Sequence, residues 1–241
     1  MRMLTFARRV TKEILTDPLN LAFGLGFPLV LLFLLSAIQA NNPVQMFEIG
    51  HLTPGITVFG LAFITLFSAT MIAKDRSSAL LQRLYTTPLR PVDFILGYTL
   101  PILPISVAQC AICYVAAVLL GLEITVNILY GILLIVPVAV LYIGLGLLCG
   151  SVLNDKQVGG ICGALLTNLS AWLSGIWFDL NLVGDTFRKI AYALPFVHAV
   201  EMERAVLAGN FGDIFPHLGW VLAYAAVSLI AAIWLFLRQM K

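Results

Sequence analysis

Six runs of about twenty apolar residues dominate this sequence and restrict it to a helical membrane fold. A hydrocarbon core about 30 Å thick takes about 20 residues of helix to cross. Charged residues make up only 11% of the chain, which is too few to cover a soluble surface. We expect one all-α membrane domain over residues 1–241, with six transmembrane helices near residues 19–40, 51–73, 93–120, 126–150, 158–178 and 216–237.

Lysine and arginine set the expected orientation, because the cytoplasmic loops of membrane proteins carry an excess of both. Eleven of the 14 basic residues fall in the N-terminal segment, the second and fourth loops and the C-terminal tail. The other three fall in the fifth loop, and the first and third loops contain none. The alternation predicts a multi-pass protein of the cell (inner) membrane with both termini in the cytoplasm.

Two segments outside the spans have patterns of their own. In residues 1–17, apolar side chains recur at spacings of three and four, which predicts an amphipathic helix in the membrane interface. An ordinary solvated helix is the alternative. Residues 179–215 are half apolar but too charged to span. With Pro195 near the middle, they predict two short re-entrant outer helices between the fifth and sixth spans.

The loop after the second span is charged and still has a helical pattern. Its stretch "KDRSSALLQRLYTTPLR", residues 74–90, holds four of the basic residues. Its apolar side chains recur at helical spacing, at Leu80, Leu81, Leu84 and Tyr85. An amphipathic helix facing the cytoplasm either lies on the lipid or inserts into a groove on a partner protein. The pattern alone favours neither.

The chain resembles the integral-membrane subunit of ABC-2 type transporters, and the likeness covers nearly its whole length. The family's loop after the second span is matched here by Asp75-Arg76, Leu81-Gln82-Arg83-Leu84, Thr87-Pro88, Asp93 and Gly97. Ala79-Leu80 and Gln82 depart from the Gly-Thr and Glu that are common there. "LTDPLNLAFGLGFPLVLLFL" is similar to the family's interfacial helix and first span, and "LPFVHAVEMERAVLAG" to its outer re-entrant segment.

The resemblance implies that residues 75–88 form a coupling helix, which docks in a cleft of a separate ATPase subunit. The residues expected at the ATPase contact are Asp75, Arg76, Leu80, Leu81, Arg83, Leu84 and Tyr85, with Asp155 and Lys156 from the short loop 153–157. A linker lying on the lipid is the alternative for residues 75–88.

The resemblance also implies the other partners. They are two copies of the ATPase, which bring ATP and Mg²⁺, and a second permease subunit that we expect to be identical. The chain lacks the G-x-x-x-x-G-K-[ST] phosphate loop. We therefore expect neither enzymatic activity nor a cofactor in this chain. A net charge of +2 without a basic patch points to no nucleic-acid partner. Membrane lipid is the expected surrounding of the apolar spans.

Polar side chains within the expected spans are few and mild. They either line a passage or bond across helices, and the candidates are Gln109, Thr167, Ser170 and Ser174. We expect export of a hydrophobic or amphipathic substrate, such as a drug, an antibiotic-like metabolite or a lipid. Export of lipid-linked polysaccharide by the same family is the alternative. A secondary transporter or channel is a further one, although the spans lack the deep Asp or Glu that ion-coupled carriers use.

Three further sequence features concern the glycines, the prolines and the histidines. Gly146-x-x-x-Gly150 and Gly159-x-x-x-Gly163 would let helices approach closely. Pro101 and Pro104 predict a kink or break in the third span. The three histidines are expected at the outer membrane boundary and not in a catalytic or metal site: His51, His198 and His217.

The predicted topology requires two engineered cysteines to label from opposite sides. In intact cells, a membrane-impermeant maleimide should label Gln45→Cys in the first loop. It should label Arg83→Cys only after the membrane is opened. The four natural cysteines lie within apolar runs, and the wild-type chain measures their background. The reverse labelling pattern would show that the orientation is inverted.

Overall fold

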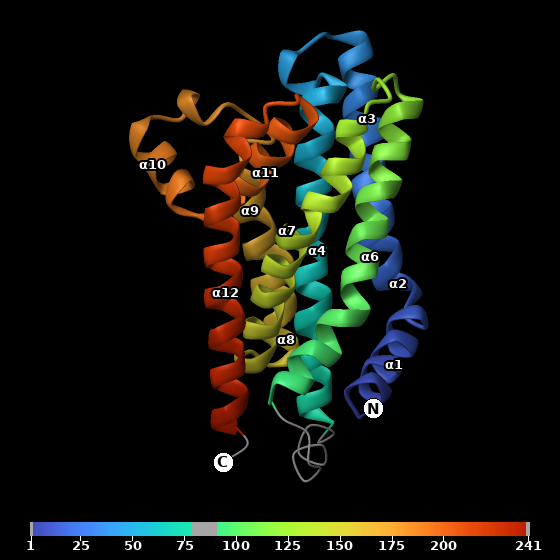
Figure 1. Ribbon diagram of the computed structural model, residues 1–241, viewed down its shortest axis with the longest axis vertical. Helices are drawn as coiled ribbons and strands as arrows, with labels where there is room; N and C mark the ends of the chain where they lie inside the picture. Colours follow the sequence, from blue (N-terminus) through green and yellow to red (C-terminus); the bar gives the residue numbers. More distant parts are fainter. Residues whose placement is uncertain (1, 79–90, 240–241) are drawn as a thin grey trace.

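The computed structural model describes residues 2–78 and 91–239, and these ranges contain helices and no strand. Figure 1 shows long helices lying side by side along one axis, with short elements at both ends. The elements are α1 (Arg2–Leu15), α2 (Pro18–Leu21), η1 (Ala22–Gly26), α3 (Phe27–Asn41), η2 (Gln45–Phe47), α4 (Ile49–Ser77), α6 (Pro91–Leu119), α7 (Val126–Val152), α8 (Asp155–Val158), η3 (Gly159–Leu166), α9 (Thr167–Trp172), η4 (Leu180–Leu182), α10 (Asp185–Ala193), α11 (Pro195–Leu207), η5 (Phe211–Asp213) and α12 (Ile214–Gln239).

Five of the six predicted spans are helices long and apolar enough to cross a membrane. Within the described residues these are Ala22–Asn41, Ile49–Ser77, Val92–Leu119, Val126–Val152 and Phe211–Arg238. The predicted fifth span, 158–178, is instead a continuous helical stretch over residues 155–172, about 27 Å long at 1.5 Å per residue. It lies alongside α4 in Figure 1. Whether it crosses the membrane stays a prediction.

The ends of the helices gather into two groups (Figure 1). The end with α1, the last turn of α4, α8 and the last turn of α12 is called the inner end here, and the opposite end, with η2, α10 and α11, the outer end. The predicted topology groups the same segments together. Which end faces the cytoplasm, and whether α10 and α11 re-enter the membrane, stay predictions.

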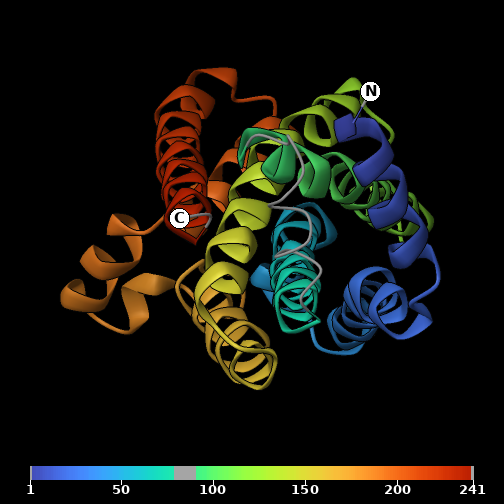
Figure 2. The same ribbon diagram turned by 90° about the horizontal axis from the view of Figure 1, so that it is seen from below.

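Helix α4 is the centre of the fold. It is largely buried and packs against α3, α6, α7 and α11, and Figure 2 shows it between α3, α6 and α7. Helix α12 packs on the far side of α7 and on α11. A helix that is apolar on all sides can be buried in this way, because no polar face has to reach water.

Glycines bring α7 into close contact with α4. A Cβ at Gly146 would lie 2.6 Å from the Thr65 carbonyl oxygen, and one at Gly150 would lie 2.7 Å from another α4 carbonyl. At this crossing the Thr65 hydroxyl donates to the Tyr142 carbonyl over 2.8 Å. The first Gly-x-x-x-Gly is confirmed as a contact motif. Gly159 of the second has no neighbour within 4 Å of an added Cβ, so that pair does not act as a contact motif within this chain.

The prolines of the third span do not break its helix. Helix α6 continues through Pro101 and Pro104, and a kink at these residues stays a prediction. Neighbouring helices make such prolines tolerable in membrane helices. The first and fifth predicted spans instead contain the π-helical segments η1 and η3. A π-helical turn changes which side chains share a face.

The N-terminal helix α1 is amphipathic, as predicted, but its apolar face contacts protein. Phe6, Val10 and Ile14 are buried, and α1 packs against α6. The Phe6 ring occupies the space that a Cβ at Gly97 would need. This contact explains why a glycine stands at the start of the third span, because a side chain there would collide with Phe6.

A buried carboxylate fastens α1 to two other helices. The two terminal nitrogens of the Arg9 guanidinium, Nη1 and Nη2, donate to the Asp75 carboxylate over 2.8 and 2.7 Å. The Tyr98 hydroxyl of α6 donates to the same carboxylate over 2.6 Å. Asp75 is 2% exposed, near the end of α4. Three helices therefore meet at one acidic side chain at the inner end.

Removing the Asp75 carboxylate should loosen α1. Asp75→Ala deletes the bidentate pair and leaves the buried Tyr98 hydroxyl without its acceptor. We expect the free energy of unfolding to fall by about 1.5–3 kcal/mol, the range for hydrogen bonds to charged groups. A larger loss is not expected, because Arg9 is 39% exposed and can turn to water.

The measurement is thermal unfolding in detergent, with Glu13→Ala as the matched control. Glu13 also pairs with Arg9, over 2.9 Å, but is 37% exposed, so its loss should cost under about 1 kcal/mol. Equal losses for the two variants would contradict a special role for Asp75.

Candidate functional site

At the inner end, the first two residues of the expected coupling helix belong to α4 and bind within the chain. Asp75 holds Arg9 and Tyr98. Arg76 donates from Nη1 to the carbonyls of Gly150, over 3.0 Å, and Ser151, at the C-terminal end of α7, where a cation is favourable. The other expected contact residues lie outside the described residues: Leu80, Leu81, Arg83, Leu84 and Tyr85. The ATPase contact of residues 75–88 stays a prediction.

The second expected ATPase contact is well defined locally. Helix α8 begins with a capping box. The backbone N–H of Gln157 donates to the side-chain oxygen of Asn154 over 2.9 Å, and the backbone N–H of Asn154 donates to the side-chain oxygen of Gln157 over 3.1 Å. Asp155 and Lys156 are exposed on this turn, which packs beside α4 at the inner end. Both side chains are placed where a partner could reach them.

The side chains expected along a passage are buried in helix packing. The hydroxyls of Thr167, Ser170 and Ser174 donate to carbonyls of their own segment, three to five residues earlier. Gln109 is 1% exposed and donates from α6 to the Thr57 carbonyl of α4 over 3.4 Å. A role in lining a passage stays a prediction.

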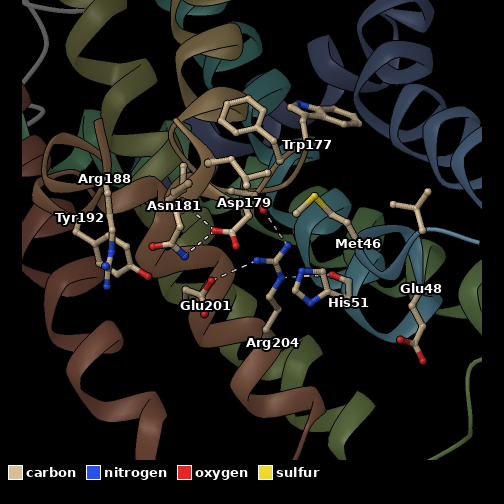
Figure 3. Close-up of a pocket in the computed structure, with 15 residues that line it drawn as sticks. Met46, Glu48, His51, Trp177, Asp179, Asn181, Arg188, Tyr192, Glu201 and Arg204 are labelled. Carbon is tan, nitrogen blue, oxygen red and sulfur yellow. Dashed lines mark hydrogen bonds and ion pairs between the residues drawn. The ribbon is translucent and has the colours of Figure 1, made fainter. Parts of the chain in front are cut away.

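At the outer end, two neighbouring cavities form what we call the outer trough. They measure about 760 and 590 Å³, within the about 300–1,000 Å³ range of small-molecule sites. Both are lined by Glu48, His51 and Arg204, which form the neck between them. The larger cavity also takes residues from the loop after α9, from α10 and from α11 (Figure 3).

Arg204 of α11 holds the neck together (Figure 3). Its guanidinium donates to Glu201 over 3.2 Å, to the Gly175 carbonyl over 3.1 Å and to the His51 carbonyl over 3.4 Å. Gly175 has a φ of +69°, a conformation that favours glycine. One side chain thus ties α11 to the start of α4 and to the loop after α9.

The rest of the larger cavity combines aromatic rings with planar polar groups. Asp179 accepts hydrogen bonds from the backbone and side-chain amides of Asn181, over 2.9 and 2.7 Å. Arg188 lies 5.7 Å from the centre of the Tyr192 ring. Trp177 packs edge-on against Phe59 of α4. Rings and paired hydrogen-bonding groups of this kind suit a polar organic ligand.

A buried carboxyl group also lies in α11. Glu203 is fully buried and accepts a hydrogen bond from the Tyr114 hydroxyl over 3.3 Å, and its other oxygen has no partner among the described residues. Helix α11 is not one of the five candidate spans, and burial raises the pKa of the Glu203 carboxyl to about 8. Sequence reasoning missed this group, although its spacing from Phe196, Ala199 and Val200 places it on the buried face of the helix.

His198 and His217 are in contact with each other at the outer end. His198 is 5% exposed, its Nδ1 lies 2.8 Å from Nδ1 of His217, and its ring stacks on Trp220. This contact joins α11 to α12. The position of the three histidines at the outer membrane boundary stays a prediction. His51 lines the outer trough. The described residues contain no group of three His, Cys, Asp or Glu side chains that could hold a metal ion.

Comparison with known families agrees with this architecture. The family model described as "ABC-2 family transporter protein" matches residues 33–234. The chain belongs to the ABC-2 transporter family. Proteins of this family are membrane permeases that typically pair with an ATPase subunit.

Individual relatives of this ABC-2 protein are distant. Nodulation protein J of Bradyrhizobium diazoefficiens is 24% identical over 227 residues, which cover 94% of this chain and 85% of that protein. The capsule polysaccharide export inner-membrane protein CtrC of Neisseria meningitidis is 28% identical in serogroup A and 32% in serogroup B. Each CtrC match covers 54% of this chain and 48% of the relative, about half of its length. The ABC-2 chain is, like CtrC, a multi-pass inner-membrane protein.

Replacing Glu203 by glutamine should stabilise this ABC-2 protein most at high pH. The folded pKa of about 8 lies above the ordinary 4.5, so the folded state binds more protons than the unfolded state between these values. Stability is therefore lost as pH rises from about 4.5 to about 8. Glutamine does not titrate and can keep the bond to Tyr114, so the Tm advantage of Glu203→Gln should grow from pH 5 to pH 8.

Thermal unfolding at four or five pH values tests this expectation. The matched control is Glu123→Gln, the same change at an exposed position, and the gain in Tm of Glu203→Gln from pH 5 to pH 8 should exceed that of the control. A Glu203→Gln difference that does not change with pH would mean that the folded Glu203 carboxyl ionises normally.

Proposed function

We propose that this chain is the permease subunit of an ATP-driven exporter that moves a lipid-linked saccharide out of the cell. The observation that carries the proposal is the match to the ABC-2 family over residues 33–234. CtrC supports the choice of substrate, because it is named for the export of capsule polysaccharide. Membership of this family speaks against a secondary transporter or channel.

The cavities also favour a saccharide over the hydrophobic or amphipathic substrate, such as a drug, metabolite or lipid, that is expected from the sequence. The apolar cavity between η1, α4 and α6 measures about 10 Å³, far below the size of a drug site. The large cavities have mixed walls, in which apolar surface is the larger part but several charged groups are also present. Apolar ligands would have to strip water from those groups at a cost in free energy, whereas a saccharide can form hydrogen bonds with them.

Helix α4 supplies the route by which ATP hydrolysis in a partner would act on the permease. Its first turn holds His51 at the neck of the outer trough. Its last turns hold Asp75 and Arg76, which bind α1, α6 and the end of α7. A displacement of the loop after α4 would therefore move several helices together. The complex would contain two ATPase subunits with ATP and Mg²⁺, and a second, identical permease.

A charged substitution in the expected coupling helix should abolish capture of the ATPase. Leu84→Asp places a carboxylate on the apolar ridge that we expect to be buried in the ATPase cleft, which is unfavourable without a partner charge. The chain is co-expressed with the ATPase encoded beside it and purified by a tag. Wild type should retain the ATPase and Leu84→Asp should lose it.

The matched control is Leu182→Asp, the same change at an 82% exposed position of the outer end. It should retain the ATPase. Retention by Leu84→Asp, with normal membrane insertion, would return residues 75–88 to a lipid-lying linker and remove the main support for ATP coupling through this loop.

A further inference from the structure

The outer trough is held in shape by contacts between parts of the chain that are distant in sequence. Arg204 has only 12% of its side chain exposed. Each of its three guanidinium nitrogens donates one hydrogen bond, to Glu201, to the Gly175 carbonyl or to the His51 carbonyl. The neck is therefore fixed by hydrogen bonds before any ligand arrives. Preorganised walls reduce the entropy lost when a ligand binds.

The charges around the larger cavity nearly balance. Glu201 is paired with Arg204. The other charged lining groups are the carboxylates Glu48 and Asp179 and the guanidinium of Arg188. The one excess carboxylate disfavours a phosphate-rich or acidic ligand and attracts a cation only weakly. The lining therefore offers no strong counter-charge to an ion of either sign, which suits a ligand without net charge.

The polar groups that face the cavity suit hydroxyl groups (Figure 3). Asp179 uses Oδ1 for both bonds from Asn181, which leaves Oδ2 as an acceptor. Glu201 likewise bonds Arg204 through one oxygen. Carboxylate oxygens accept hydrogen bonds and a side-chain amide can donate and accept them. The Trp177 ring also lines the cavity and offers an apolar surface to C–H groups, whereas Arg188 lies over the Tyr192 ring. A sugar presents both kinds of surface.

From this geometry we infer that the outer trough binds an uncharged, hydroxyl-rich segment of a saccharide at the outer end of the permease. The inference rests on the proposed function and deepens it by assigning a binding site to one subunit. The larger cavity receives the sugar rings, and the neck at Arg204 leads to the smaller cavity beside the turn between α6 and α7. Because His51 lies at the start of α4, the site is connected directly to the helix that ends at the coupling loop.

The first experiment blocks the trough chemically in cells. Leu182→Cys is introduced into a strain that lacks its own permease and carries the partner ATPase, and surface glycan is measured. Leu182 lines the larger cavity and is 82% exposed, and none of the hydrogen bonds proposed for the sugar involves it. Without reagent, Leu182→Cys should therefore export like wild type, which shows that it folds. A bulky, membrane-impermeant maleimide should then reduce surface glycan to the level of the strain without permease.

The matched control is Asp213→Cys, an exposed position in η5 at the same end that does not line the trough. Its labelling should leave export unchanged. Normal export by labelled Leu182→Cys would overturn the inference. If the unlabelled wild-type chain fails to restore surface glycan, the proposed function fails, and this outcome is distinct from failure of the trough.

The second experiment identifies the ligand class with purified Leu182→Cys. Labelling by the same maleimide is followed with and without the saccharide that mild acid releases from the host's lipid-linked glycan. Slower labelling of Leu182→Cys, but not of Asp213→Cys, supports the site. Protection by the lipid fraction alone would mean a lipid site, and absence of protection by either fraction would overturn the assignment.

Discussion

The close contact between α4 and α7 is the interaction on which the rest of the structure depends. Helices in lipid gain little from the hydrophobic effect and associate by close packing and hydrogen bonds. Gly146 and Gly150 remove the side chains that would hold the two backbones apart, and the Thr65 hydroxyl bonds across the gap. With α4 fixed at the centre, α3, α6 and α11 can pack around it and α12 can pack on α7.

Polar interactions are concentrated at the two ends of α4. At the inner end, Asp75 and Arg76 join α4 to α1, α6 and α7. At the outer end, the His51 carbonyl is held by Arg204 of α11. Charged groups are least costly near water or when fully paired, which accounts for this arrangement. Under the proposed function, the same arrangement would make α4 a mechanical link between the expected ATPase contact and the outer trough.

Several features could be predicted because they depend on local pattern. Apolar run length gave five helices that can cross a membrane, and helical spacing gave the buried face of α1. Gly146 and Gly150 were recognised as a contact motif. The pattern predicts Asp75 at the ATPase contact, whereas the side chain is buried against Arg9 and Tyr98, because a sequence does not show that these residues come within bonding distance. The His198–His217 contact could not be predicted for the same reason. Helical spacing could have placed Glu203 on a buried face, but it does not show that Tyr114 is its partner.

The sequence by itself determined the membrane class, the span lengths, the expected orientation and the family likeness, since each follows from composition and spacing along the chain. Tertiary structure alone decided which polar groups meet. The outer trough joins residues near positions 48, 179 and 204, and the inner cluster joins Arg9, Asp75 and Tyr98. Contacts between residues so far apart depend on how the helices pack, because the periodicity of one helix does not specify which face of another it will meet.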